Sequence, residues 1–164
     1  MSLQVETPLP SAKDVRDLLE GLLGREVAVR TGAPMVDPGA GGGALVGLYV
    51  DRLMSLKAIC LMDVPLAAYV GASIGLVPAR VAEESAVAEM LEGPLEENAR
   101  EVLNVLASLM NAEGAPHVRL DAAYSPREDL PHDAAPWVRA YVRRTDLVVD
   151  VAGYGSGGFS LLVL

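Results

Sequence analysis

The stretch PLEENAREVLNVLASLMN, residues 94–111, has the apolar period of an α-helix. Its apolar residues recur three or four positions apart, which places them on one side of a helix and predicts that this side is buried. The stripe consists of Leu95, Ala99, Val102, Leu103, Leu106 and Met110. Gly93 and Pro94 mark the start of the helix.

Polar residues line the opposite side of the same helix. They are Glu97, Glu101, Asn104 and Ser108, and we call them the polar row. A carboxylate and a carboxamide one turn apart are able to contact a charged partner and to position a water molecule. The simpler interpretation is a solvated face, because amphipathic helices normally turn polar residues outward. Asn104 favours a functional interpretation, because asparagine lowers the helix propensity of this segment and nothing visible in the sequence compensates for that loss.

Composition predicts one folded domain, residues 1–164, with an aliphatic core. Hydrophobic residues make up 51% of the chain and aromatic residues only 4%, while 22 acidic and 13 basic residues give a net charge of −9. The acidic charge argues against nucleic acid and anionic membrane surfaces as partners, because both need basic patches. The single cysteine, Cys60, lies in an apolar run and predicts a buried side chain in a reducing compartment. The N-terminus has no signal-peptide pattern, so we expect a cytoplasmic protein.

Local signals predict an α+β fold, with an antiparallel sheet and helices packed on it. Ser11 and Asp63 are expected helix N-caps, and Pro65 favours the first turn of its helix. The expected helices cover residues 12–23, 64–76, 81–91, 94–111 and 133–143. The expected strands cover residues 25–31, 44–51, 55–62, 117–124, 147–152 and 159–164, the last two joined by a glycine-rich turn at 153–158.

No other segment predicts a strong site. Gly39–Gly43 lacks the Lys-Ser/Thr of a phosphate loop and leads into a strand, so a flexible loop is the better interpretation. Asp129, His132 and Asp133 form a short polar loop, in which a helix cap at Asp133 is favoured over loose cation binding. Arg139, Arg143 and Arg144 are interpreted as helix-end residues. We therefore predict no metal site.

The string Glu97–Asn104 resembles the signature of the CheC/CheX/FliY chemotaxis phosphatase family. That signature is Asp or Ser, three residues, Glu, two residues and Asn, with a proline some two dozen positions later. Glu101 and Asn104 match its Glu and Asn, and Pro126 falls close to the expected proline. The similarity covers roughly residues 11–126, and the single Glu-x-x-Asn copy is as in CheX. Glu97 stands where the family has Asp or Ser.

The resemblance implies a phosphatase acting on the aspartyl phosphate of a CheY-like response regulator. Glu101 would pair with a regulator lysine, and Asn104 would orient the attacking water. Glu97 and Ser108 would contact the partner from the same face. The Mg²⁺ ion would belong to the regulator, so the chain would need no cofactor of its own. The alternative is a non-catalytic CheX-like fold that acts as a protein-interaction module in signalling; the oligomeric state, including a homodimer, stays open.

Overall fold

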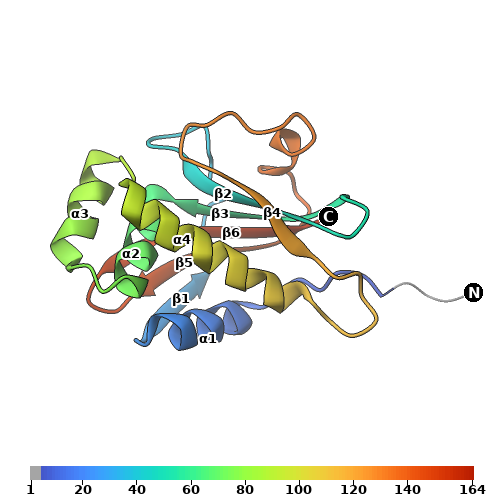
Figure 1. Ribbon diagram of the computed structural model, residues 1–164, viewed down its shortest axis with the longest axis horizontal. Coiled ribbons are helices and arrows are strands. Elements are labelled where there is room, and N and C mark those ends of the chain that lie inside the picture. Colours follow the sequence, from blue (N-terminus) through green and yellow to red (C-terminus); the bar gives the residue numbers. More distant parts are fainter. Residues whose placement is uncertain (1–4) are drawn as a thin grey trace, which may run out of the picture.

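Six antiparallel strands form one sheet in the order β1-β5-β6-β3-β2-β4 (Figure 1). The computed structural model describes residues 5–164. The strands are β1 Val27–Thr31, β2 Ala44–Val50, β3 Leu56–Asp63, β4 Arg119–Tyr124, β5 Arg143–Val151 and β6 Gly155–Val163. The edges of the sheet are therefore β1 and β4, which lie far apart in sequence.

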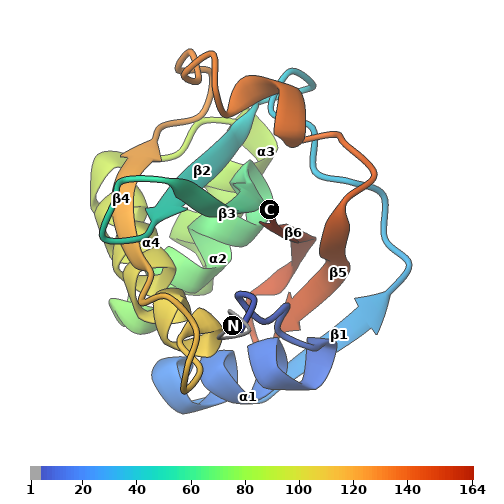
Figure 2. The ribbon, with the colours of Figure 1, turned by 90° about the vertical axis from the view of Figure 1, so that its right-hand side faces the viewer.

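Three of the four α-helices pack on one face of this sheet. Figure 2 shows the strands curving around α2, with α1 and α4 beside it. Ser11 closes a capping box with Asp14 at the start of α1, and the Asp63 carboxylate accepts the Leu66 N–H at the start of α2. Both predicted caps are confirmed. The helices are α1 Ala12–Leu23, α2 Val64–Ile74, α3 Ala79–Ala88 and α4 Gly93–Leu106, and a short 3-10 helix, η1 Ala107–Met110, continues α4.

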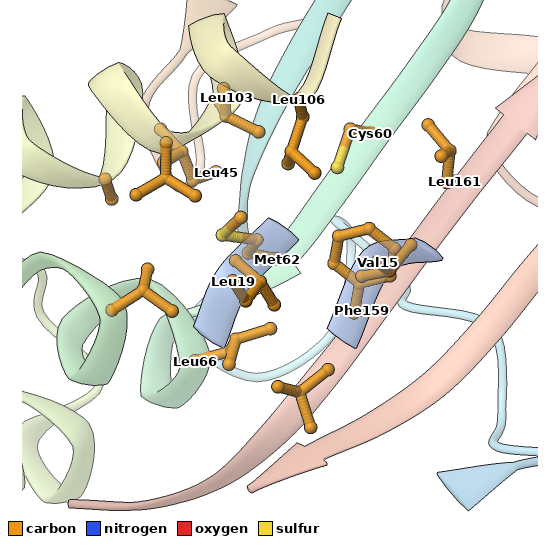
Figure 3. Close-up of a cluster of buried hydrophobic side chains, with 14 of the residues drawn as sticks. Val15, Leu19, Leu45, Cys60, Met62, Leu66, Leu103, Leu106, Phe159 and Leu161 are labelled. Atoms are coloured by element: carbon orange, nitrogen blue, oxygen red, sulfur yellow. The ribbon is translucent and has the colours of Figure 1, made fainter. Parts of the chain in front are cut away.

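The main core lies between the sheet and these helices. Alternate residues of the central strands point into it, as the register of Leu45 with Met62 and of Cys60 with Leu161 shows. Figure 3 shows these side chains meeting Leu103 and Leu106 from α4. Each large aliphatic side chain buried in this way contributes about 1.5–3 kcal/mol through removal from water. The aliphatic core predicted from composition is confirmed.

The opposite face of the sheet is covered by two long loops rather than by helices. Val46, Leu48, Ile59 and Leu61 point to this face and pack beneath the loops. The covering side chains include Val36 from the loop before β2 and Ala134, Val138 and Leu130 from the segment before β5.

The predicted helix over residues 133–143 is wrong. Only a 3-10 turn, η2 Ala135–Trp137, forms there, without a side-chain cap, and β5 already begins at Arg143. The Arg144 side chain is 7% exposed, pairs with Asp146 at 2.8 Å, and donates to the carbonyl oxygens of Val138 and Ala140 at 3.2 and 2.9 Å. These carbonyl oxygens therefore accept hydrogen bonds from a guanidinium group instead of from helix amides. Arg144 has a buried side chain that fixes this loop, and it is not a helix-end residue.

The glycine-rich turn predicted over residues 153–158 is also mostly strand. The chain reverses within residues 152–154, and β6 begins at Gly155. A Cβ atom on Gly157 would overlap the Leu66 backbone nitrogen and the Asp63 carboxylate. Glycine is needed at this position because α2 lies directly against β6, which is a requirement of packing and not of a turn.

Candidate functional site

Helix α4 crosses the sheet with its apolar stripe inward, as predicted. All six residues of the stripe are buried, five of them in the main core and Leu95 against α2 and α3. Pro94 lies in the first turn of the helix, where its missing N–H has no intrahelical partner to lose. The α-helical bonding ends at Leu106, and η1 carries the chain on to Met110. The helix predicted over residues 94–111 is thus confirmed, with a tighter last turn.

The whole polar row lies on the exposed side of this element. Glu97, Glu101, Asn104 and Ser108 are all exposed, and Glu101 and Asn104 share one turn of α4. Within residues 5–164, neither Glu97 nor Glu101 forms an ion pair, and Asn104 makes no side-chain hydrogen bond. The face that the sequence singled out is therefore accessible and unpartnered along its length.

Two hydrogen bonds that hold α4 in place involve Asn98 and Tyr49, residues that the sequence analysis did not single out. The Asn98 amide donates to the Gly71 carbonyl oxygen of α2 at 3.0 Å, and the buried Tyr49 hydroxyl donates to the Leu103 carbonyl oxygen at 2.6 Å. A Cβ atom on Gly71 would overlap the Leu95 carbonyl oxygen, so glycine permits the close contact of α2 with α4. Burial raises the pKa of Tyr49, which keeps this hydroxyl a donor at neutral pH. These contacts fix the helix from its buried side.

A third attachment joins the flank of α4 to the edge strand β4. Arg100 donates to the Ala123 carbonyl oxygen at 3.2 Å and to the Ser125 hydroxyl at 3.1 Å, and it pairs with Glu96 at 3.3 Å. The Ser125 hydroxyl in turn donates to Glu96 at 3.0 Å. The i, i+4 spacing of Glu96 and Arg100 was visible in the sequence and predicts such a pair. Pro126 follows Ser125 directly, so the proline of the signature lies beside this attachment.

The electrostatics of the two sides of α4 differ. On the flank, Glu96 is neutralised by Arg100. On the open face, Glu97 and Glu101 stand four residues apart with like charge, an arrangement that destabilises a helix by about 0.2–0.5 kcal/mol. A cationic side chain brought by another molecule would remove this repulsion. The face is thus suited to a partner that carries a lysine or an arginine.

The other candidate segments do not join this face. Gly39–Gly43 is a loop that leads into β2, as predicted, and Asp129, His132 and Asp133 belong to the loop region between β4 and β5. No group of three or more His, Cys, Asp or Glu side chains suited to a metal occurs within residues 5–164. Cys60 is buried, as predicted, and burial raises its pKa.

A pocket beside these loops is also separate from the polar row. It is a cavity of about 560 Å³ between residues 33–43, the start of α2 and residues 156–158. Its two partly buried carboxylates already have partners. Asp37 accepts the Gly39 N–H at 2.9 Å and pairs with Arg139 at 3.5 Å. Asp63 accepts the N–H groups of Leu66 and Gly158 at 2.9 and 2.8 Å. Burial is the main reason that the pKa of Asp63 is raised. The carboxylate serves as a helix cap and a strand contact, which leaves the exposed face of α4 as the candidate site.

The chain has the fold of the CheC/CheX/FliM-middle class of domains. This conclusion comes from solved structures, since neither the family models nor the curated proteins gave a match. The FliM–SpeE complex from H. pylori matches with a TM-score of 0.61 and 8% identity over 93% of this chain and 80% of the matched chain. The FliM middle domain from H. pylori gives 0.52 and 9% over 93% and 84%.

The CheX–CheY–BeF3–Mg²⁺ complex from Borrelia burgdorferi matches with a TM-score of 0.50 and 12% identity, over 91% of this chain and 92% of the matched chain. The α+β fold and the structural resemblance predicted from the sequence are therefore confirmed. No helix within residues 5–164 is both long and apolar enough to cross a membrane.

Proposed function

We propose that this chain binds a phosphorylated CheY-like response regulator through the exposed face of α4 and hydrolyses its aspartyl phosphate. The observation that carries the proposal is the exposure of Glu101 and Asn104 on one turn of a fixed helix, in a fold found in a complex that contains CheX and CheY. Residues three apart on a helix have Cβ atoms about 5–6 Å apart, so both side chains reach one small target.

The proposed chemistry relies on positioning. The Glu101 carboxylate pairs with a regulator lysine, and the Asn104 amide holds a water in line with the phosphorus. The water oxygen bonds to phosphorus as the phosphorus–oxygen bond to the aspartyl carboxylate breaks, giving a free carboxylate and inorganic phosphate. The regulator supplies Mg²⁺ to neutralise the phosphoryl oxygens, and this chain contributes no cofactor. Phosphoryl transfer of this kind depends on geometry and electrostatics rather than on covalent help from the protein.

Glu97 and Ser108 extend the proposed docking surface at the two ends of the row. They are eleven positions apart, which corresponds to about 16 Å along an α-helix. This length suits contact with a second globular domain. Glu97 provides a second carboxylate for the basic side chains of the partner, and Ser108 provides a neutral donor and acceptor at the far end.

A non-catalytic regulator-binding module is the second candidate. The observation that favours it is Glu97, which is exposed, unpaired within the described residues and placed where the family signature has Asp or Ser. Glutamate is one methylene longer than aspartate. A regulator held by Glu97 and Glu101 together would bind with its phosphate displaced from Asn104, and hydrolysis would then be lost while binding remained.

The test uses purified CheY-like receiver domains from the same genome. Binding is measured by calorimetry with each receiver activated by BeF3⁻ and Mg²⁺, and hydrolysis by phosphate release from the phosphorylated receiver. We expect Asn104→Ala to keep binding and to lower the catalysed rate about 100-fold, as loss of a positioned water would do. Glu101→Gln should weaken both, whereas Glu26→Gln, the same change at the opposite edge of the sheet, should alter neither.

Each remaining outcome decides between the candidates. Binding without hydrolysis by the unaltered protein supports the interaction module and overturns the phosphatase. An unchanged rate in Asn104→Ala also overturns the catalytic assignment. Failure of every receiver to bind rejects both candidates.

A further inference from the structure

A second unpartnered surface lies on α3, away from the polar row. Leu76, Val87 and Met90 are 84%, 80% and 68% exposed. They are three of the eight large hydrophobic side chains exposed within the described residues, and they fall within 15 consecutive positions. Val87 lies in α3, while Leu76 precedes the helix and Met90 follows it. Single exposed hydrophobics are common, but three in so short a segment favour a contact surface. Val87 also lines a groove on α3, and we call this groove, together with the exposed Leu76 and Met90 that flank the helix in sequence, the α3 patch.

The groove runs along the outer side of α3. Its volume is about 390 Å³, and its lining residues are Arg80, Glu83, Glu84, Val87 and Ala88. Figure 1 shows α3 at the periphery, where α2 separates it from the sheet. Its inner side packs through Ala82 onto Ala68 and Ala72. The inner side of α3 is thus buried by its packing on α2, whereas no element within residues 5–164 packs on its outer side.

The surroundings of the patch are strongly acidic. Between Leu76 and Gly93 the sequence has four glutamates and one basic residue, Arg80. Glu83, Glu84 and Glu89 are exposed and form no ion pair within the described chain. Of these, Glu83 and Glu84 line the groove beside the apolar Val87 and Ala88. This combination complements a partner that has apolar side chains on one face and lysines or arginines around them.

We propose that the α3 patch binds a cationic amphipathic helix of a partner protein. The patch follows a ten-residue helix, about 15 Å, which matches about three turns of a helix laid along it. Strand addition is unsuited to this surface because neither edge strand, β1 or β4, belongs to it. Nucleic acid and anionic lipid are disfavoured by the acidic surroundings.

The test uses a fluorescent 14-residue peptide of leucine and lysine with helical amphipathic spacing. A peptide of the same composition, with its order changed to remove that spacing, measures attraction by charge alone. Fluorescence anisotropy should show binding of the amphipathic peptide that weakens with added salt, and little binding of the reordered peptide. Amide chemical shifts should change on α3.

Variants locate the binding on the patch. Val87→Ser removes an apolar anchor and should weaken binding roughly tenfold, the loss expected for about 1.4 kcal/mol of apolar contact. Glu84→Lys should weaken it further at low salt. The matched controls are Leu53→Ser, at a side chain that is 85% exposed in the turn between β2 and β3, and Glu26→Lys beside β1. Neither control should change the affinity by more than about twofold, since neither touches the patch.

Several results would overturn the proposal. Equal binding of both peptides would show charge attraction without a groove, and equal losses in the controls would place the peptide elsewhere. Concentration-dependent dimerisation that is abolished by Val87→Ser would assign the patch to a second copy of this chain. Receiver binding at α4 should be unchanged in Val87→Ser, so this proposal and the proposed function can fail independently.

Discussion

Replacing Asn104 by alanine should make the protein more stable while removing the proposed activity. The Asn104 side chain is exposed and makes no hydrogen bond within the described residues, so its removal leaves no unsatisfied group. Alanine is favoured over asparagine in a helix by about 0.5 kcal/mol. For a domain of this size, 1 kcal/mol shifts the melting temperature by about 2–4 °C, so Asn104→Ala should raise it by about 1–2 °C.

The same substitution elsewhere in α4 provides the control. Asn98 is partly buried and donates to the Gly71 carbonyl oxygen at 3.0 Å. Loss of a hydrogen bond of this kind costs about 1 kcal/mol, which exceeds the gain in helix propensity. Asn98→Ala should therefore lower the free energy of unfolding, whereas Asn104→Ala raises it. Both variants are measured by urea unfolding, with m-values compared to confirm that the unfolded states are alike.

The sign of the change at Asn104 decides the question. An equal loss of stability in the two variants would show that Asn104 supports the fold, and its presence would then need no functional explanation. A gain in stability without any loss of receiver binding or hydrolysis would leave the asparagine unexplained and would refute the assignment. A residue that is retained for function although it lowers helix stability should show both a gain in stability and a loss of activity when it is replaced.

Three further variants test the packing and the electrostatics. Gly71→Ala should lower the free energy of unfolding by about 1–3 kcal/mol in urea, because its Cβ would overlap the Leu95 carbonyl oxygen. Ser160→Ala should cost about 1–3 kcal/mol, since the hydroxyl that accepts the Val36 N–H at 3.0 Å is removed from a buried site; a cost near zero would show that this hydrogen bond does not hold the loop before β2. Burial raises the pKa of Asp63 above that of the unfolded chain, so the folded state holds the proton more tightly. Relative to Asp63→Asn, the stability of the unaltered protein should be greatest below the unfolded pKa and should fall as the pH rises through the folded pKa; a difference independent of pH would be the contrary result.

Local signals predicted the parts of the fold that local chemistry determines. The caps at Ser11 and Asp63 and the buried stripe of α4 depend on residues within one or two turns of each other. The exposure of Glu101 and Asn104 followed from the same helical period. These features could be predicted because the interactions that produce them span only a few positions along the chain.

The incorrect predictions concern residues whose roles are set by distant contacts. Val138, Tyr141 and Val142 have helical spacing, but the sheet beneath buries Val138 and part of Val142. The Arg144 guanidinium binds the carbonyl oxygens of Val138 and Ala140. Gly157 resembles a turn residue in the sequence, but glycine is required there because α2 packs closely on β6. At the site, Asn98 and Tyr49 bind partners 27 and 54 positions away, so no pattern along the helix marks them.

These long-range contacts explain why the polar row is able to act as a surface of fixed shape. Asn98 and Tyr49 fix the buried side of α4, and the pair of Glu96 with Arg100 fixes its flank to β4. A helix attached in this way loses little further conformational freedom when a partner binds, so more of the contact energy is left for affinity and orientation. The one side without attachments carries two like charges that a cationic partner would neutralise. The packing of α4 and the exposure of its outer face therefore both support the proposal that this face binds another protein.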